Sequence, residues 1–219
     1  DPSFDSGKYL GGRTSGWFVG LPSGAKPVVV TPPNKSSLFS APGYTGFAQR
    51  YSNRMNAVLY TGNDGLLTAI GYTNGKNPNP SVLWSWMPSG LLPQLQNYGS
   101  FWRGPNMAGG FTEVDSNGGS STSPSWSSYV VGSADNGQII YDLQLSGTSS
   151  LGLGKTIAEY DLGNLQNLYG LIPATGGSPA IYWNNDGQGY AAWSLNYTAS
   201  SSSKTQSGVF LLDVSTGEN

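Results

Sequence analysis

Short apolar runs, each broken within a few positions by glycine, proline or serine, follow one another along the chain. β-Branched and aromatic residues are frequent within these runs, as in residues 57–61 (AVLYT), 66–70 (LLTAI) and 138–145 (QIIYDLQL). Runs of about four to eight such residues between turn formers are typical of β-strands. Because glycine and proline interrupt most windows long enough for a helical period, the pattern predicts an all-β chain.

Pairs of these runs flank tight turns of similar composition at residues 62–65 (GNDG), 134–137 (ADNG) and 184–187 (NNDG). In each turn, Asn or Asp before Gly can adopt the positive φ angles that a hairpin requires. The pattern therefore predicts hairpins of one design, followed by a further strand at residues 208–214. The structural turn residues are expected to be Asn63, Asp64, Gly65, Asp135, Asn136, Gly137, Asn185, Asp186 and Gly187.

The remaining stretches show little regular pattern. Residues 27–51 and 91–126 are expected to form long connections. Residues 89–98 (SGLLPQLQNY) are the best candidate for a helix, with Ser89 in position to act as the N-cap and Pro93 limiting the length. At most one short helix is therefore expected.

The repeated hairpins, separated by connections rich in Ser, Gly and Pro, predict an architecture in which small sheets pack on one another. We expect an irregular β-propeller segment of about four blades. The turns at Asp64, Asn136 and Asp186 lie 72 and 50 positions apart, whereas a regular blade repeats every ~40–50 residues. A β-sandwich of short strands is the alternative. Because no stretch has the composition of an interdomain linker, residues 1–219 are expected to form a single propeller-like domain.

The composition excludes several kinds of chemistry. The 219 residues include no Cys and no His, which rules out disulfides, thiolate metal sites and a Ser-His-Asp triad. Charged residues make up 10% and the formal net charge is −2, so nucleic acid binding is not expected. No apolar run approaches the ~18 residues of a membrane span. Few charges with 32 Gly and 12% aromatic residues are typical of a secreted or cell-surface protein.

Carboxylate pairs are the remaining candidates for catalysis. Glu113 with Asp115, and Glu159 with Asp161, are i, i+2 pairs that would share one face of a strand. Glycoside hydrolysis needs two such groups about 5–10 Å apart in a groove, but solvated or turn-capping carboxylates are the simpler interpretation. Residues 115–118 (DSNG) begin like a calcium loop and then lose the alternation of ligands. No catalytic, cofactor-binding or metal-binding residue is therefore predicted, and the protein is not expected to be an enzyme.

Aromatic residues are the other functional candidates, with 7 Trp and 13 Tyr in the chain. Their rings could form a surface on which sugars or peptides stack. Most tryptophans lie in or beside predicted strands, so packing inside and between the sheets is the favoured interpretation. These tryptophans are Trp84, Trp86, Trp102, Trp126, Trp183 and Trp193.

Taken in order, several segments resemble the C-terminal propeller of the PilC/PilY family, large proteins associated with the tips of bacterial type IV pili. Residues 59–70 (LYTGNDGLLTAI) are similar to the family's most distinctive motif, VYVGANDGMLHAF. Residues 9–22 resemble its opening, LGD…S…VYVG.P. Tyr44, Phe47 and Arg54 resemble the aromatic residues and the arginine before its central strand.

The same order continues to the end of the chain. Residues 84–95, 130–143 and 179–217 resemble the family's segments WAFIP…L…L, TVLVGG…GGR.VYALD and P.I….DG.W.VVFGNGY…LYILD..TG. Thr68 departs from the pattern, because the family usually has histidine there. The family's calcium loop of alternating Asp and Asn lies beyond Asn219, so no cofactor is implied within this chain. Both chain ends fall inside what resembles continuous propeller sequence, which implies a fragment of a larger protein.

The resemblance implies a non-enzymatic protein of the type IV pilus tip that acts in pilus assembly and surface adhesion. The implied partners are pilin or minor pilin subunits and a host or surface receptor, with neither nucleic acid binding nor membrane insertion. The implied location is extracellular or at the cell surface, at the pilus tip or outer membrane. Two alternatives are a quinoprotein-like propeller enzyme, which would need quinone and calcium ligands, and a structural or carbohydrate-binding β-protein of an extracellular filament.

Overall fold

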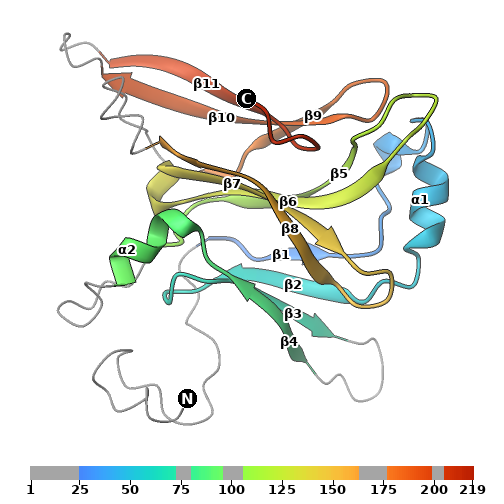
Figure 1. Cartoon of the computed structure of the whole chain (residues 1–219), viewed down its shortest axis with the longest axis horizontal. Helices are drawn as coiled ribbons and strands as arrows, with labels where there is room; N and C mark the ends of the chain where they lie inside the picture. Colours follow the sequence, from blue (N-terminus) through green and yellow to red (C-terminus); the bar gives the residue numbers. More distant parts are fainter. Residues whose placement is uncertain (1–24, 73–79, 96–105, 163–176, 199–204) are drawn as a thin grey trace.

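The computed structural model describes residues 25–72, 80–95, 106–162, 177–198 and 205–219, which contain three antiparallel sheets (Figure 1). The first sheet contains β1 (Val28–Val30), β2 (Asn56–Thr61), β3 (Leu67–Tyr72) and β4 (Ser81–Trp86). The second contains β5 (Phe111–Asn117), β6 (Trp126–Ala134), β7 (Ile139–Ser146) and β8 (Gly152–Asp161). The third contains β9 (Ala180–Trp183), β10 (Gly189–Thr198) and β11 (Thr205–Asp213). The prediction of a mainly β chain with short antiparallel hairpins is confirmed.

Each sheet is a meander, because strands that follow one another along the chain also pair with one another. The turns at residues 62–65 and 134–137 join the second and third strands of the first two sheets. The turn at residues 184–187 instead joins the first and second strands of the third sheet. The prediction that each of these turns closes an antiparallel hairpin is confirmed for all three.

The predicted turn residues lie in these connections. Asp64 Oδ1 accepts a hydrogen bond of 3.2 Å from the backbone N–H two residues later, which is the ordinary use of an Asp side chain in a turn. Gly65 and Gly187 have φ angles of +80° and +79°, which residues with a side chain rarely adopt. Asp135 and Asn136 also have positive φ angles, of +49° and +56°. The other residues of the set are Asn63, Gly137, Asn185 and Asp186.

The described residues contain two α-helices, α1 (Tyr44–Arg50) and α2 (Leu92–Leu95), so the prediction of at most one is wrong. The α2 helix lies where a helix was predicted, but Ser89 does not cap it. The Ser89 hydroxyl instead donates a hydrogen bond of 2.8 Å to Glu159 Oε1. Neither described helix is long and apolar enough to cross a membrane.

The α1 helix and two of the strands lie in segments that were predicted to be connections. In α1, Gly46 weakens the local helical preference, and the helix is held by the buried rings of Tyr44 and Phe47. The β5 strand ends in polar residues, which are typical of turns. Asp115 and Asn117 in this strand are nevertheless fully buried, because tertiary hydrogen bonds satisfy their polar atoms.

The three sheets lie in successive layers, with β5–β8 between the other two (Figure 1). Buried side chains such as Leu59 and Leu143 fill the space between the first and second sheets. Val131 and Leu212 lie between the second and third sheets. The second sheet is therefore covered on both faces, which places it at the centre of the core.

Candidate functional site

The first predicted carboxylate pair lies at the centre of a buried polar cluster. Glu113 and Asp115 are both on β5 and, as the strand period requires, on the same face. Glu113 Oε2 lies 2.7 Å from Lys35 Nζ, and its Oε1 lies 4.0 Å from a terminal nitrogen of Arg54. The Glu113 side chain is only 7% exposed, and its two carboxylate oxygens face the partly exposed Lys35 and the buried Arg54.

Asp115 is held by hydroxyl groups. The Tyr44 hydroxyl donates a hydrogen bond of 2.7 Å to Asp115 Oδ2, and the Ser128 hydroxyl donates one of 2.6 Å to Oδ1. Arg54 in turn donates hydrogen bonds to Ser128 Oγ at 2.9 Å and to the Thr31 carbonyl at 2.7 Å. The cluster thus joins β5 and β6 to α1 and to the segments on either side of it.

The charges of this cluster balance, with Lys35 and Arg54 against Glu113 and Asp115. Burial raises the pKa of Glu113 to about 7, and the nearby Asp115 carboxylate adds to the increase, while Lys35 opposes it. Burial also lowers the pKa of Arg54. Because each carboxylate already has internal partners and little access to solvent, the arrangement stabilises the packing of α1 on the second sheet.

The second predicted carboxylate pair has a different use. Glu159 Oε1, on β8, accepts hydrogen bonds of 2.8 Å from the Ser89 hydroxyl and 2.9 Å from the Gly90 N–H. Glu159 therefore anchors the segment that leads into α2. Asp161 lies two positions further along the same strand.

The stretch at residues 115–118 does not form a calcium loop. Asn117 Oδ1 accepts hydrogen bonds from the N–H groups of Gly119 at 2.9 Å and Ser125 at 2.8 Å. Its side-chain oxygen therefore organises the β5–β6 connection. Within the described ranges, no group of three or more His, Cys, Asp or Glu residues is placed to hold a metal ion.

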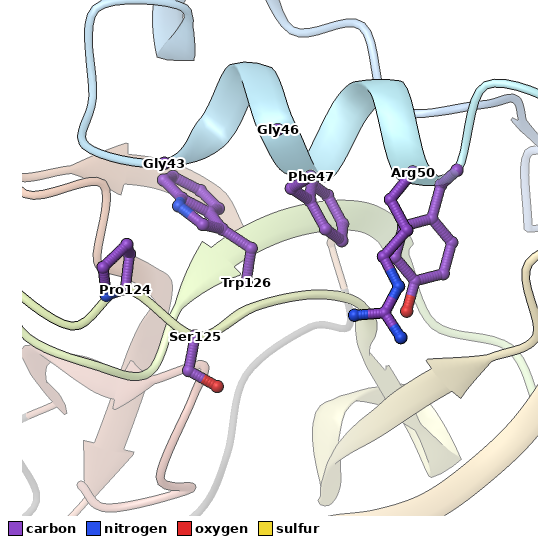
Figure 2. Close-up of a pocket in the computed structure, with 8 residues that line it drawn as sticks. Gly43, Gly46, Phe47, Arg50, Pro124, Ser125 and Trp126 are labelled. Carbon is purple, nitrogen blue, oxygen red and sulfur yellow. The ribbon is translucent and has the colours of Figure 1, made fainter.

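A pocket of about 340 Å³ lies between α1 and the beginning of β6 (Figure 2). We call it the α1 pocket. Its walls are formed by Gly43, Gly46, Phe47, Arg50, Tyr51, Pro124, Ser125 and Trp126. The Trp126 ring is oriented by a hydrogen bond of 2.7 Å from its Nε1 to the Pro42 carbonyl, and it lies 6.1 Å from the Phe47 ring in a stacked arrangement.

The α1 pocket is connected to the buried cluster through Tyr51. The guanidinium carbons of Arg50 and Arg54 lie 5.9 and 5.8 Å from the centre of the Tyr51 ring, within the range of cation–π contact. Arg54 is buried and faces Glu113. Arg50 is exposed, and in the part of the chain that the structure describes it has no carboxylate partner. The pocket wall therefore carries an uncompensated positive charge.

The sequence reasoning missed Lys35, Arg50 and Tyr51 as parts of this site. Several residues of this site follow one another at spacings of three or four positions, which is the helical period. They are Tyr44, Phe47, Arg50 with Tyr51, and Arg54. That spacing was the available signal, but the glycines at 43 and 46 obscured it.

The tryptophans for which packing was predicted lie partly in the core and partly on the walls of two cavities. Trp84 and Trp86 pack against the core between the first and second sheets, and Trp193 lies in the core between the second and third. Trp126 lines the α1 pocket, and Trp183 lines a second cavity of about 340 Å³ beside residues 37–41. That second cavity has no charged side chain on its walls. Trp102 and residues 9–22 lie outside the described residues.

One further carboxylate lies alone in the core. Asp142, on β7, is fully buried, and neither of its oxygens has a hydrogen-bond partner among the described residues. It pairs across the sheet with Val131 and Ala158, which pack in the core between the second and third sheets. Burial raises the pKa of Asp142 to about 9, and the Asp213 carboxylate adds to the increase. Asp142 is therefore protonated at neutral pH.

Comparisons of the chain with protein-family models, with curated proteins and with solved structures found no match.

Proposed function

We propose that the chain is an irregular β-propeller segment of a non-enzymatic protein of the type IV pilus tip, similar to the PilC/PilY family. It acts in pilus assembly and surface adhesion by recognising other molecules through its surface. The observation that carries the proposal is the succession of antiparallel meanders packed face to face, which is how neighbouring blades of a propeller pack.

The packing favours a propeller over the alternative of a β-sandwich. In a sandwich, two sheets face one another and each has an outer face in contact with solvent. Here the second sheet is covered on both faces. The third sheet is covered on one face, while Tyr182, Val209 and Leu211 on its other face are 66%, 71% and 52% exposed. That face is suited to pack against a further blade.

The buried cluster supports a non-enzymatic role over a glycosidase. The acids of a glycosidase face a groove that holds the substrate. Glu113 and Asp115 face Lys35, Arg54, Tyr44 and Ser128 instead. Neither carboxylate lines the α1 pocket or the second cavity.

In this proposal the protein lies outside the cell, at the pilus tip or outer membrane. Its partners are pilin or minor pilin subunits and a host or surface receptor. The low charge and the formal net charge of −2 suit recognition by shape and by polar contacts more than electrostatic attraction to a polyanion.

Antibodies raised against the 219-residue chain can test the assignment on pili sheared from the source bacterium. Gold labelling at one end of each filament, together with fewer pili and weaker adhesion after deletion of the gene, is the expected result. Labelling along the whole filament would overturn the proposal in favour of a filament subunit. Unlabelled pili and unchanged adhesion would overturn it altogether.

A further inference from the structure

We propose that the α1 pocket binds a carboxylated sugar, a hexuronate residue of a polysaccharide, with Arg50 pairing the carboxylate. This inference goes beyond the pilus-tip assignment and does not depend on it. It rests on the shape of the pocket, on the charge of one wall and on the aromatic rings that line the others.

The pocket has the size of a small-ligand site and reaches the helix backbone. Its volume of about 340 Å³ falls within the ~300–1,000 Å³ usual for ligand pockets. A Cβ atom added at Gly46 would meet no other atom within 4 Å. Gly46 is exposed and lines the pocket, so its missing side chain leaves this wall open.

The charge of the pocket favours an anion. The Arg50 side chain extends from α1 into the space below the helix (Figure 2), and its guanidinium carbon lies 5.9 Å from the centre of the Tyr51 ring. A guanidinium fork matches the two oxygens of a carboxylate. Arg54 lies across the Tyr51 ring but already faces Glu113. One uncompensated cation matches the single charge of a carboxylate. The chain has only 10 Lys and Arg residues, so this positive charge is not part of a generally basic surface.

The other walls suit a sugar ring. The half-buried rings of Tyr51 and Trp126 line the pocket with the buried Phe47 ring behind them, and their apolar surface can pack against the C–H face of a sugar. Ser125 is exposed, and its hydroxyl has no hydrogen-bond partner among the described residues, so it can bond a sugar hydroxyl. The pocket thus combines an apolar platform, a hydroxyl and a cation, which together match the three chemical features of a hexuronate.

Calorimetric titration of the full chain with trigalacturonate, and with its fully methyl-esterified form, tests the proposal. The ester has the same sugar rings and lacks the charge, so the acid is expected to bind about tenfold more tightly. Arg50→Gln should reduce binding of the acid to the level of the ester, and Arg50→Lys should restore part of the difference. Lys155→Gln is the matched control, because it removes an exposed positive charge on β8, and it should leave binding unchanged.

A second pair of variants tests the location without relying on charge. Gly46→Leu should fill the pocket and abolish binding of both ligands, while Gly46→Ala should retain most of it. Circular dichroism and thermal melting verify that each variant is folded. Equal binding of acid and ester, or no binding of either, would overturn the proposal. So would binding of a sulfated sugar or of a peptide C-terminus alone, or undiminished binding by folded Gly46→Leu.

Discussion

The hydroxyl of Tyr44 donates a 2.7 Å hydrogen bond to Asp115 Oδ2, although the two residues are 71 positions apart in the chain. This bond fastens the first turn of α1 to β5, inside the protein. The same hydroxyl accepts a hydrogen bond of 2.9 Å from the Lys35 N–H. The position of α1, and with it one wall of the α1 pocket, therefore depends on a buried phenol that has both a donor and an acceptor as partners.

Tyr44→Phe should destabilise the fold by about 1–3 kcal/mol, because it leaves a buried carboxylate oxygen and a backbone N–H without this partner. The aromatic contacts with Phe47 and Trp126 would persist. Urea unfolding at neutral pH measures the change. Tyr51→Phe is the matched control and should alter the free energy of unfolding by less than about 0.5 kcal/mol. Equal losses in the two variants would show that the Tyr44 hydroxyl has no special role.

Glu113 should make stability depend on pH. Its pKa in the folded protein is raised to about 7 from an ordinary value of 4.5, so the folded state holds this proton more tightly than the unfolded state does. Its contribution to the free energy of unfolding is therefore fully present below about pH 4.5 and is lost as pH rises through 7. Glu113→Gln removes this titration, and its stability should fall less than that of the unmodified chain between pH 5 and 8. Parallel pH profiles, measured by urea unfolding, would contradict the expectation.

Asp142→Asn should stabilise the protein under alkaline conditions. The pKa of Asp142 is raised to about 9 by burial, so the folded state resists its ionisation, and the associated stability falls as pH rises from the ordinary range of an Asp toward 9. Asparagine has nearly the same shape and stays neutral. Thermal melting at pH 5 and at pH 8.5 should show a larger gain in Tm for the variant at the higher pH. A gain that is the same at both values would indicate a packing effect instead.

Gly187 in the β9–β10 turn and Gly46 in α1 should respond oppositely to alanine. Gly187 has a φ angle of +79°, and an added Cβ would lie 2.2 Å from the Trp126 ring, so Gly187→Ala should cost more than about 1 kcal/mol. Gly46 is helical and has open space beside it. Gly46→Ala should therefore stabilise the protein by about 0.5–1 kcal/mol. The free energies of unfolding of the two variants test this, and a loss at Gly46 would mean that the space beside α1 is not open.

The hairpins could be predicted from the sequence because their geometry is local. The Asp64–Gly65 turn needs only a residue that bonds its own backbone and one that accepts a positive φ angle, and both are visible in the sequence. The placing of Glu113 and Asp115 on one face follows from the strand period alone. Which strands a turn connects within its sheet is not local: residues 184–187 join the first two described strands of the third sheet, whereas the other two turns join the second and third strands of theirs.

The sequence by itself determined the β class of the chain, its turn positions and the chemistry that a lack of Cys and His excludes. Only the tertiary structure decided that α1 is a helix, because the Tyr44 and Phe47 rings gain their partner Trp126 when the second sheet forms. It also decided the surroundings of the Glu113 carboxylate, because its partner Lys35 lies 78 positions away in the chain. Local backbone preferences act over a few residues, whereas burial and the pairing of charges depend on segments that meet only when the sheets stack.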